Sequence, residues 1–328
     1  NRLDISQPSL TNAIHELEKE MGINIFNRSN KGISPSIEGE VFLGYARQVL
    51  EQAKVLEDKY KGDDGGKKSF CVSTQHYSFA VNAFVDLIKR YGQDEYDFSI
   101  RETQTYEIID DVARMRSEIG ILFMNDFNEK VLNKILRAND LEFHELFVAK
   151  PHVFISRKHP LAKNDIITNE ELEAYPYLSF EQGEHNSFYF SEEIFSTTER
   201  KKNIRVRDRA TLFNLLIGLN GYTVCSGVID EKLNGKDIIS VPLADESDMR
   251  IGYIVHRKAI LSRLGNTYLG ALANYLTAGS DESEDSVKIP QRKLQHRGRF
   301  NEMRDDGEPA CGDVREKAAE HMRRVKAT

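Results

Sequence analysis

The sequence predicts a mixed α/β chain that begins with a helix-and-hairpin unit and a long helix and continues as two consecutive α/β lobes. Up to about residue 61, apolar residues recur at every third or fourth position, which is the period of helices with one apolar face. Beyond the run KGDDGGKK at residues 61–68, short strand-like apolar runs alternate with helical stretches. Such alternation is typical of a parallel α/β sheet.

Length and composition indicate a globular chain of two or three compact units. The 328 residues exceed what one ordinary core supports. Hydrophobic residues make up 40% of the chain and charged residues 30%. No run approaches the roughly 18 apolar residues of a membrane-spanning helix, so we expect no membrane partner.

The net charge of −7 argues against DNA binding that depends on bulk positive charge, because affinity for phosphates comes mainly from lysine and arginine. Residues 1–61 contain eight Lys and Arg against nine Asp and Glu. Any contact with DNA must therefore depend on where individual side chains lie.

A capped amphipathic helix is predicted over Ser6–Met21. Ser6 is a capping residue, Pro8 lies in the first turn, and Gly22 ends the helix. Its apolar side chains are spaced by four, three and four residues: Leu10, Ile14, Leu17 and Met21. Its other faces carry side chains of types that can reach base edges: Gln7, Ser9, Thr11, Asn12, His15 and Lys19.

A hairpin and a long helix are predicted next. Asn30-Lys31-Gly32 supplies turn chemistry, with Arg28 and Lys31 at the tip. A helix followed by such a hairpin indicates a wing. The long helix runs from Ile37 to Lys61 and has one apolar face, which needs a partner surface: Phe42, Tyr45, Val49, Ala53, Leu56 and Tyr60.

Two similar α/β lobes are predicted after the glycine-rich run. Strands at residues 70–74, 96–102 and 119–124, with helices at 79–91 and 106–115, form the first lobe. The second has the strand runs HVFIS, YLSF, NIRVR and YTVCS and a helix over Arg209–Leu219. After residues 237–243, the strand MRIGYIV and the helix Leu261–Leu276 return to complete the first lobe. From about Ala278 the chain is polar and turn-rich, which indicates a flexible extension.

The N-terminal residues resemble the LysR-type transcriptional regulators. The stretch RLDISQPSLTNAIHELEKEMGINIFNRSNKGISPSIEGEVFLGYARQVL carries the family's motifs SQPSL, ELEKEMG, IFNR and SPSIEGE at the family's spacing. A weaker resemblance continues over residues 69–275, at IGILF, at His159 to Leu161 and at RATLFNLLIGLNGYTVCSG. Two departures stand out, because the family's first helix should precede Asn1 and nothing after Leu276 corresponds to the family.

The resemblance implies a winged helix-turn-helix without its first helix, a linker helix and a two-lobed effector domain of periplasmic-binding-protein type. We divide the chain accordingly into a partial DNA-binding domain (1–36), a dimerisation helix (37–61), a hinge (62–68), an effector domain (69–276) and an extension (277–328). Lobe 1 comprises 69–147 and 244–276, and lobe 2 comprises 148–243.

For DNA, the second helix of such a motif enters the major groove with its amino-terminal residues at the bases. We expect base or nearby phosphate contacts from Gln7, Pro8, Ser9, Thr11 and Asn12, and backbone contacts from Arg28 and Lys31. A solvated helix face is the alternative for any one of these residues. A dimer formed through the linker helix predicts a pseudo-palindromic double-stranded operator; a buried core helix is the alternative for the linker.

For the effector, strand ends and helix amino termini converge between the lobes and offer unpaired N–H groups. They favour a small polar or anionic metabolite. The expected contacts are Ser73, Thr74, Gln75, His76, Thr103, Ser179, Glu181, Thr211, Ser226 and Gly227. Ordinary helix capping is the alternative for the serines and threonines.

The cysteines and histidines predict no cofactor or metal. Cys71, Cys225 and Cys311 are far apart and contain no CxxC pair, which favours a reducing cytoplasm. Thiol sensing at Cys71 or Cys225 is possible in principle, but buried inert thiols explain them better. The best-placed histidines have no metal-ligand spacing: His144, His152, His159 and His185.

Three classes of function compete. An enzyme is not supported, because no GxSxG, GxGxxG, P-loop or HExxH motif is present. A solute-binding protein without DNA function would use the same lobes but has no use for residues 1–61. We therefore expect a regulator that forms a homodimer, paired into a tetramer. Its ligand would change the angle of the DNA-reading heads, the DNA bend and contact with RNA polymerase.

Overall fold

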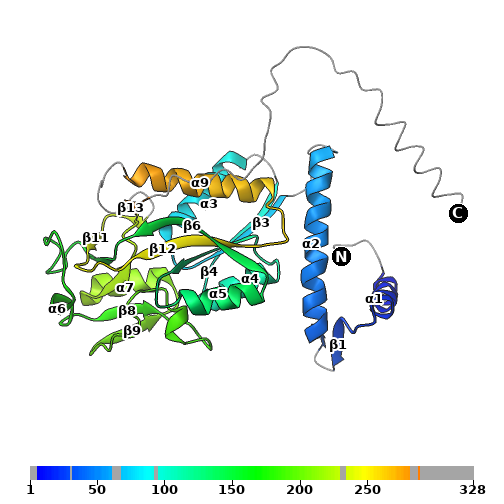
Figure 1. Cartoon of the computed structure of the whole chain (residues 1–328), viewed down its shortest axis with the longest axis horizontal. Coiled ribbons are helices and arrows are strands. Elements are labelled where there is room, and N and C mark those ends of the chain that lie inside the picture. The colour runs from blue at the N-terminus through cyan, green and yellow to red at the C-terminus, as the bar shows by residue number, and fades with distance from the viewer. Residues whose placement is uncertain are drawn as a thin grey trace, which may run out of the picture. The chain divides into compact units, whose positions relative to one another are not determined.

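The computed structural model describes residues 6–29, 32–60, 68–91, 95–229, 234–280 and 287–288. These residues form a helix-and-hairpin unit, a long helix and two α/β lobes, each with its own sheet (Figure 1). The mixed α/β fold class predicted from the sequence is confirmed.

The N-terminal unit follows the predicted capping and turn signals. Its elements are α1 (Gln7–Met21), the antiparallel strands β1 (Phe26–Ser29) and β2 (Gly32–Pro35), and the long α2 (Ile37–Tyr60). Helix α1 begins where Ser6 Oγ accepts the Ser9 N–H at 3.3 Å, and it ends at Gly22, whose φ of 68° is left-handed. The predicted turn residues Asn30 and Lys31 lie outside the described residues.

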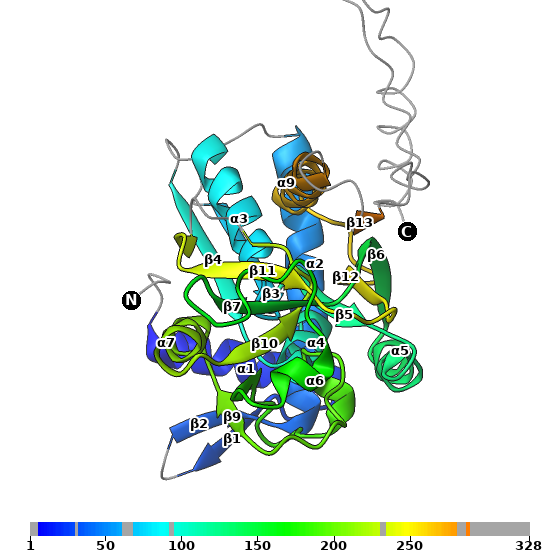
Figure 2. The same ribbon diagram turned by 90° about the vertical axis from the view of Figure 1, so that its left-hand side faces the viewer.

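The sheet of lobe 1 has six strands in the order β13-β6-β12-β5-β3-β4. They are β3 (Lys68–Thr74), β4 (Tyr96–Glu102), β5 (Ile119–Met124), β6 (Leu141–Ala149), β12 (Met249–His256) and β13 (Val287–Lys288). Helices α3 (Ser78–Tyr91) and α9 (Arg263–Ser280) cover one face, and α4 (Thr105–Ala113) and α5 (Glu129–Ala138) cover the other (Figure 1, Figure 2). The predicted return of the late strand and helix to the first lobe is confirmed.

The sheet of lobe 2 has five strands in the order β11-β7-β10-β8-β9. They are β7 (His152–Ser156), β8 (Tyr177–Phe180), β9 (Asn203–Val206), β10 (Tyr222–Cys225) and β11 (Ile238–Pro242), with α6 (Asn169–Leu172), a 3-10 turn (Phe188–Phe190) and α7 (Arg209–Leu219). Helix α7 has the predicted bounds because Asp208 caps its start and the left-handed Asn220 ends it.

Three expectations need correction. The sheets are not wholly parallel: β12 runs antiparallel to β5 and β6, and β7 runs antiparallel to β10 and β11. The expected division after residue 147 falls inside β6, which stays in the lobe 1 sheet to Ala149. The extension is partly ordered, because α9 continues to Ser280 and Val287–Lys288 pair with β6. Residue 61 of the expected dimerisation helix, residues 62–67 of the hinge and the rest of the extension lie outside the described residues.

One hydrophobic cluster joins the two lobes. It contains Phe79 and Tyr268 on lobe 1 and Tyr222 on lobe 2, all essentially inaccessible to solvent. The two lobes therefore share part of one hydrophobic core. No helix in the described ranges is both long and apolar enough to cross a membrane.

Candidate functional site

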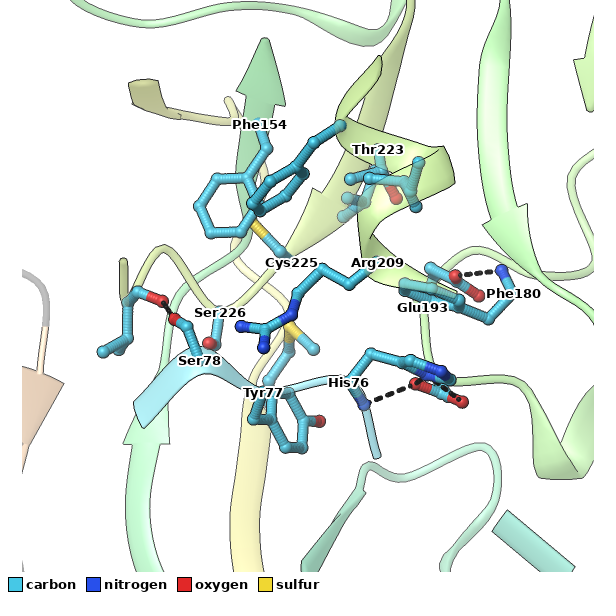
Figure 3. A pocket seen from close by; sticks show the side chains of 16 residues that line it. His76, Tyr77, Ser78, Phe154, Phe180, Glu193, Arg209, Thr223, Cys225 and Ser226 are labelled. Carbon is cyan, nitrogen blue, oxygen red and sulfur yellow. Dashed lines mark hydrogen bonds and ion pairs between the residues drawn. The ribbon is translucent and has the colours of Figure 1, made fainter. Parts of the chain in front are cut away.

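A cavity of about 40 Å³ lies where the two lobes meet. Lobe 1 contributes the loop from β3 to α3 and the start of β12, and lobe 2 contributes β7, β8, β10, the start of α7 and residues 192–193. The polar lining consists of His76, Tyr77, Ser78, Glu192, Glu193, Arg209, Thr223, Cys225 and Ser226 (Figure 3). The apolar lining consists of Phe154, Phe180, Leu212, Phe213, Val224, Val228 and Met249.

Buried Gln75 positions the loop that carries His76 into the cavity. Its Oε1 accepts the Phe123 N–H at 3.0 Å, and its Nε2–H donates to Thr105 Oγ1 at 2.6 Å. The side chain thus ties the end of β3 to β5 and to the start of α4. Because an amide that is hydrogen-bonded on both sides has little freedom, the following His76 is held toward lobe 2.

His76 forms a buried ion pair with Glu192 across the lobes. Its Nδ1–H donates to Glu192 at 2.8 Å, its Nε2–H donates to the Arg207 carbonyl at 3.1 Å, and its ring stacks on Phe180 with centroids 3.8 Å apart. Both ring nitrogens face acceptors, which requires an imidazolium. Burial lowers the pKa of His76, but the charge and hydrogen bond of Glu192 outweigh burial and raise it overall.

Glu193 lies beside this pair and is almost completely buried. Its Oε1 accepts the Phe180 N–H at 2.8 Å. Burial, followed by the neighbouring charge of Glu192, raises the pKa of Glu193 to about 8. At neutral pH this carboxyl is therefore mostly protonated.

Arg209 supplies a guanidinium to the cavity from the first turn of α7. It points into the cavity toward Ser226 (Figure 3). Its Nη2 lies 2.8 Å from Glu102 Oε1 at the end of β4, which makes a second ion pair between the lobes. Burial raises the pKa of Glu102, opposed by the charge of Arg209.

Of the expected effector contacts, His76 and Ser226 line the cavity. Gly227 follows Ser226 with a φ of 81° and packs so closely on the His152 ring that a Cβ would overlap it. This glycine shapes the β10 loop rather than presenting a side chain.

The other expected contacts do not line the cavity, and most of them have partners of their own. Ser73 donates to Asp111 at 2.6 Å, and Thr74 donates to the Gln75 carbonyl at 2.8 Å. Ser73, Thr74 and Gln75 are all fully buried. Thr103 contacts Glu107, Glu181 pairs with Arg207, and Thr211 binds the cap Asp208. Ser179 lies half-buried in β8 and does not line the cavity.

Sequence reasoning missed most of the polar lining: Tyr77, Ser78, Glu192, Glu193, Arg209 and Thr223. Arg209 had a usable signal, because it directly follows a capping aspartate at a predicted helix start after a strand. The two glutamates had no such signal, because they lie in an irregular segment that begins more than 100 residues after His76 in the sequence.

The thiols are protected rather than reactive. Cys225 lines the cavity, and burial raises its thiol pKa well above the usual range. Cys71 does not line the cavity; its Sγ lies 3.1 Å from Ser117 Oγ, and burial raises its pKa too. Neither thiol is activated at neutral pH. Cys311 lies outside the described residues.

No group of three or more metal-ligating side chains occurs in the ranges that the structure covers. His144 lies in β6 and His152 in β7, whereas His159 and His185 lie in loops. His152 Nδ1 donates to the Lys150 carbonyl at 2.9 Å, and His144 pairs with Glu142 at 3.0 Å.

The expected DNA face is the start of α1. Gln7, Pro8, Ser9 and Asn12 are exposed, Thr11 is half-exposed, and the first turn carries no acidic residue. Ser9 Oγ also lies 2.8 Å from Ser6 Oγ, so it shares in the helix cap. Arg28 is exposed on β1, and Lys31 lies outside the described residues.

Two contacts fix α1 and α2 to the wing. Glu18 of α1 accepts the N–H groups of Ile25 at 2.8 Å and of Phe26 at 3.1 Å. In α2, Gly39 lies so close to Ile25 that a Cβ would overlap the Ile25 carbonyl. The glycine in the motif SPSIEGE is thus required by this close approach.

Helix α2 presents an exposed apolar stripe at a spacing of four residues. The exposed fractions are 88% for Ile37, 58% for Val41, 52% for Tyr45 and 67% for Val49. So regular an exposed stripe is typical of a helix that packs against a partner helix.

Two family models match the chain. The model described as "LysR substrate binding domain" matches residues 70–277, and the model described as "Bacterial regulatory helix-turn-helix protein, lysR family" matches residues 1–40. A DNA-binding helix and wing, joined to a two-lobed ligand-binding unit, define the class of protein as a transcriptional regulator with an effector-binding domain. The chain belongs to the LysR family.

Individual proteins agree with this assignment. The HTH-type transcriptional regulator YbhD of Escherichia coli K12 is 23% identical over 297 residues, 88% of this chain and 90% of YbhD. YnfL of the same strain is 28% identical over 184 residues, 55% of this chain, and the match spans only 58% of YnfL. A full-length OxyR variant from Pseudomonas aeruginosa has the same fold, with a TM-score of 0.58, 18% identity, and coverage of 83% of this chain and 90% of that chain.

Proposed function

We propose that this regulator reads a pseudo-palindromic operator as a dimer and is switched by a small carboxylate-bearing ligand in the cavity between its lobes. The observation that carries the proposal is the Arg209 guanidinium, which lines the cavity together with the Ser226 hydroxyl and seven apolar side chains and points toward Ser226 in Figure 3. A planar guanidinium binds a carboxylate through two parallel hydrogen bonds, and nearby hydroxyls can add further donors.

The size of the cavity couples ligand binding to lobe movement. A single water needs roughly 10–15 Å³, so a cavity of about 40 Å³ holds only a few atoms. A larger carboxylate must separate the lobes, which breaks the Arg209–Glu102 pair and loosens the His76–Glu192 pair. The ligand then shifts the arrangement of the lobes, because it binds the open arrangement more tightly than the closed one.

For DNA, we propose that Gln7, Pro8, Ser9, Thr11 and Asn12 approach the bases of the major groove. Side chains of these types make hydrogen bonds and apolar contacts to base edges. Arg28 and Lys31 would hold the phosphate backbone.

Dimerisation through α2 would place two such heads on one operator. Two dimers would form a tetramer, and the protein would act in the cytoplasm. A ligand-induced change in head angle would alter the DNA bend and contact with RNA polymerase.

A thermal-shift screen of the full chain against small carboxylates tests the effector site. A ligand at about 100 times its Kd should add roughly 2.7 kcal/mol of stability. The shift should disappear in Arg209→Gln and persist in Arg205→Gln, a matched change of an exposed arginine on β9. A ligand that stabilises both variants equally would place the binding site elsewhere.

A further inference from the structure

The cavity has an acidic side that a carboxylate ligand alone leaves unused. Glu192 and Glu193 both line it and are 6% and 4% exposed. Glu192 accepts two hydrogen bonds from His76, at 3.0 and 2.8 Å, and one from Gln182 at 3.2 Å. Glu193 accepts one from the Phe180 main chain, and no described Lys, Arg or His side chain forms an ion pair with it.

An unpaired buried carboxylate is costly, so Glu193 keeps its proton instead. Burial first and the charge of Glu192 second raise the pKa of Glu193 to about 8. A positively charged ligand group at this position would oppose both effects, because it would pair directly with Glu193, whereas the charge of His76 lowers the pKa of Glu193 only as its smallest cause. The site therefore favours a ligand that places a positively charged group next to Glu193.

The acidic and basic groups lie on different sides of the cavity. Figure 3 shows Glu193 beside Phe180 on one side and Ser226 beside Ser78 on the other, with the Arg209 guanidinium pointing toward Ser226. Most of the remaining lining is apolar. A ligand that matches the acidic side, the basic side and the apolar lining carries an ammonium, a carboxylate and a short apolar body.

We propose that the effector is an α-amino acid with an apolar side chain, its ammonium at Glu193 and its carboxylate at Arg209 and Ser226. This inference rests on the proposed function, which requires only the carboxylate. It adds a second recognition element and names the class of ligand.

Binding of this ligand releases a proton. The protonated Glu193 carboxyl gives its proton to solvent, and the resulting carboxylate pairs with the incoming ammonium. The charged or titratable groups around Glu193 are Glu192, His76, Tyr77, Tyr177 and Arg209. Burial raises the pKa of both tyrosines, which stay neutral. Arg209 keeps its charge when the ligand carboxylate replaces Glu102 as its partner, and His76 still faces Glu192. One proton released per ligand gives about a tenfold rise in affinity from pH 6 to pH 7.

Calorimetric titration of the full chain tests the proposal. The probes are L-valine, L-leucine and L-phenylalanine. Each is compared with two analogues, one that lacks the amino group and one that lacks the carboxylate. We expect an amino acid to bind at least tenfold more tightly than both of its analogues. Titration at pH 7 in buffers of different ionisation enthalpy should show close to one proton released.

A Glu193→Gln variant separates a ligand contact from a structural role, because the amide resembles the protonated carboxyl and can still accept the Phe180 N–H. It should abolish proton release and weaken amino-acid binding at least tenfold, while the affinity for the deaminated analogue changes less than twofold. Glu184→Gln, at an exposed position outside the cavity, is the matched control and should behave as wild type.

The outcomes distinguish the two proposals. Equal affinity for an amino acid and its deaminated analogue overturns the amino-acid assignment and leaves the carboxylate site standing. The same conclusion follows if no amino acid binds but another carboxylate in the wider screen binds in a way that depends on Arg209. If no carboxylate of either kind binds, both proposals fail.

Discussion

Removing one partner of the buried His76–Glu192 pair should strongly destabilise the closed lobes. Both side chains are only 4% exposed, and the pair joins residues 116 positions apart. A His76→Phe change keeps a ring to stack on Phe180 but leaves Glu192 without its cation. Removing one partner of a buried pair costs about 3–5 kcal/mol. At roughly 2–4 °C per kcal/mol for a domain of this size, about 3 kcal/mol lowers the Tm by about 6–12 °C.

The size of this loss should depend on pH in a defined direction. The pKa of His76 is raised in the folded protein above its ordinary value of 6.5. A raised imidazole pKa gives stability that is fully present below pH 6.5 and disappears as the pH rises through the folded pKa. The deficit of His76→Phe should therefore be largest near pH 6 and smaller at pH 9.

Thermal unfolding followed by far-UV circular dichroism suits this chain, which has no tryptophan. His144→Phe is the matched control, because His144 also pairs with a glutamate and stacks on an aromatic ring, but at the surface with 29% exposure. Its loss should stay below about 1 kcal/mol. Equal losses in both variants, or a His76→Phe deficit that grows with pH, would refute the reasoning.

Three further predictions follow from the same structure. Because burial raises the pKa of Glu193 to about 8 from 4.5, the folded state holds a proton that the unfolded chain releases. Stability should fall by roughly 1 kcal/mol per pH unit between pH 5 and 8, and urea unfolding of Glu193→Gln should lack that slope. Gly39→Ala should separate α2 from the wing and lower the Tm. Gly270→Ala, at a helix position with open space around it, should instead raise the stability by up to about 1 kcal/mol. Equal Tm values for the two variants would contradict the close approach of Gly39 to Ile25. Val49→Glu should convert dimers to monomers in light scattering. Ile166→Glu, at another exposed apolar side chain outside the stripe, should not. A dimer that survives Val49→Glu would exclude this face.

Local signals made most of the fold predictable. The bounds of α7 came out as expected because Asp208 caps it and Asn220 ends it, and both signals are local. Strand direction was not predictable in the same way, because an apolar run has the same period whichever way it runs. The pattern of β12 therefore predicts one more strand of a parallel sheet, although β12 lies between β5 and β6 and runs antiparallel to both.

The candidate site was less predictable because its groups come together through long-range contacts. His76 and Ser226 lie within two residues of the ends of β3 and β10, so their position at the sheet edge could be anticipated. Ser73 also lies at a strand end, but its hydroxyl binds Asp111, 38 residues away, and faces the interior of lobe 1. The partnership of Glu192 with His76 depends on how an irregular segment of lobe 2 folds against lobe 1.

A ligand held by Arg209 is expected to change how the dimer contacts DNA. The most direct test is DNase I footprinting on an operator selected from a random-sequence library, with and without a ligand found by thermal shift. We expect the ligand to change the footprint of the wild type and to leave that of Arg209→Gln unchanged. A ligand that stabilises the wild type through the cavity yet leaves its footprint unaltered would contradict the account.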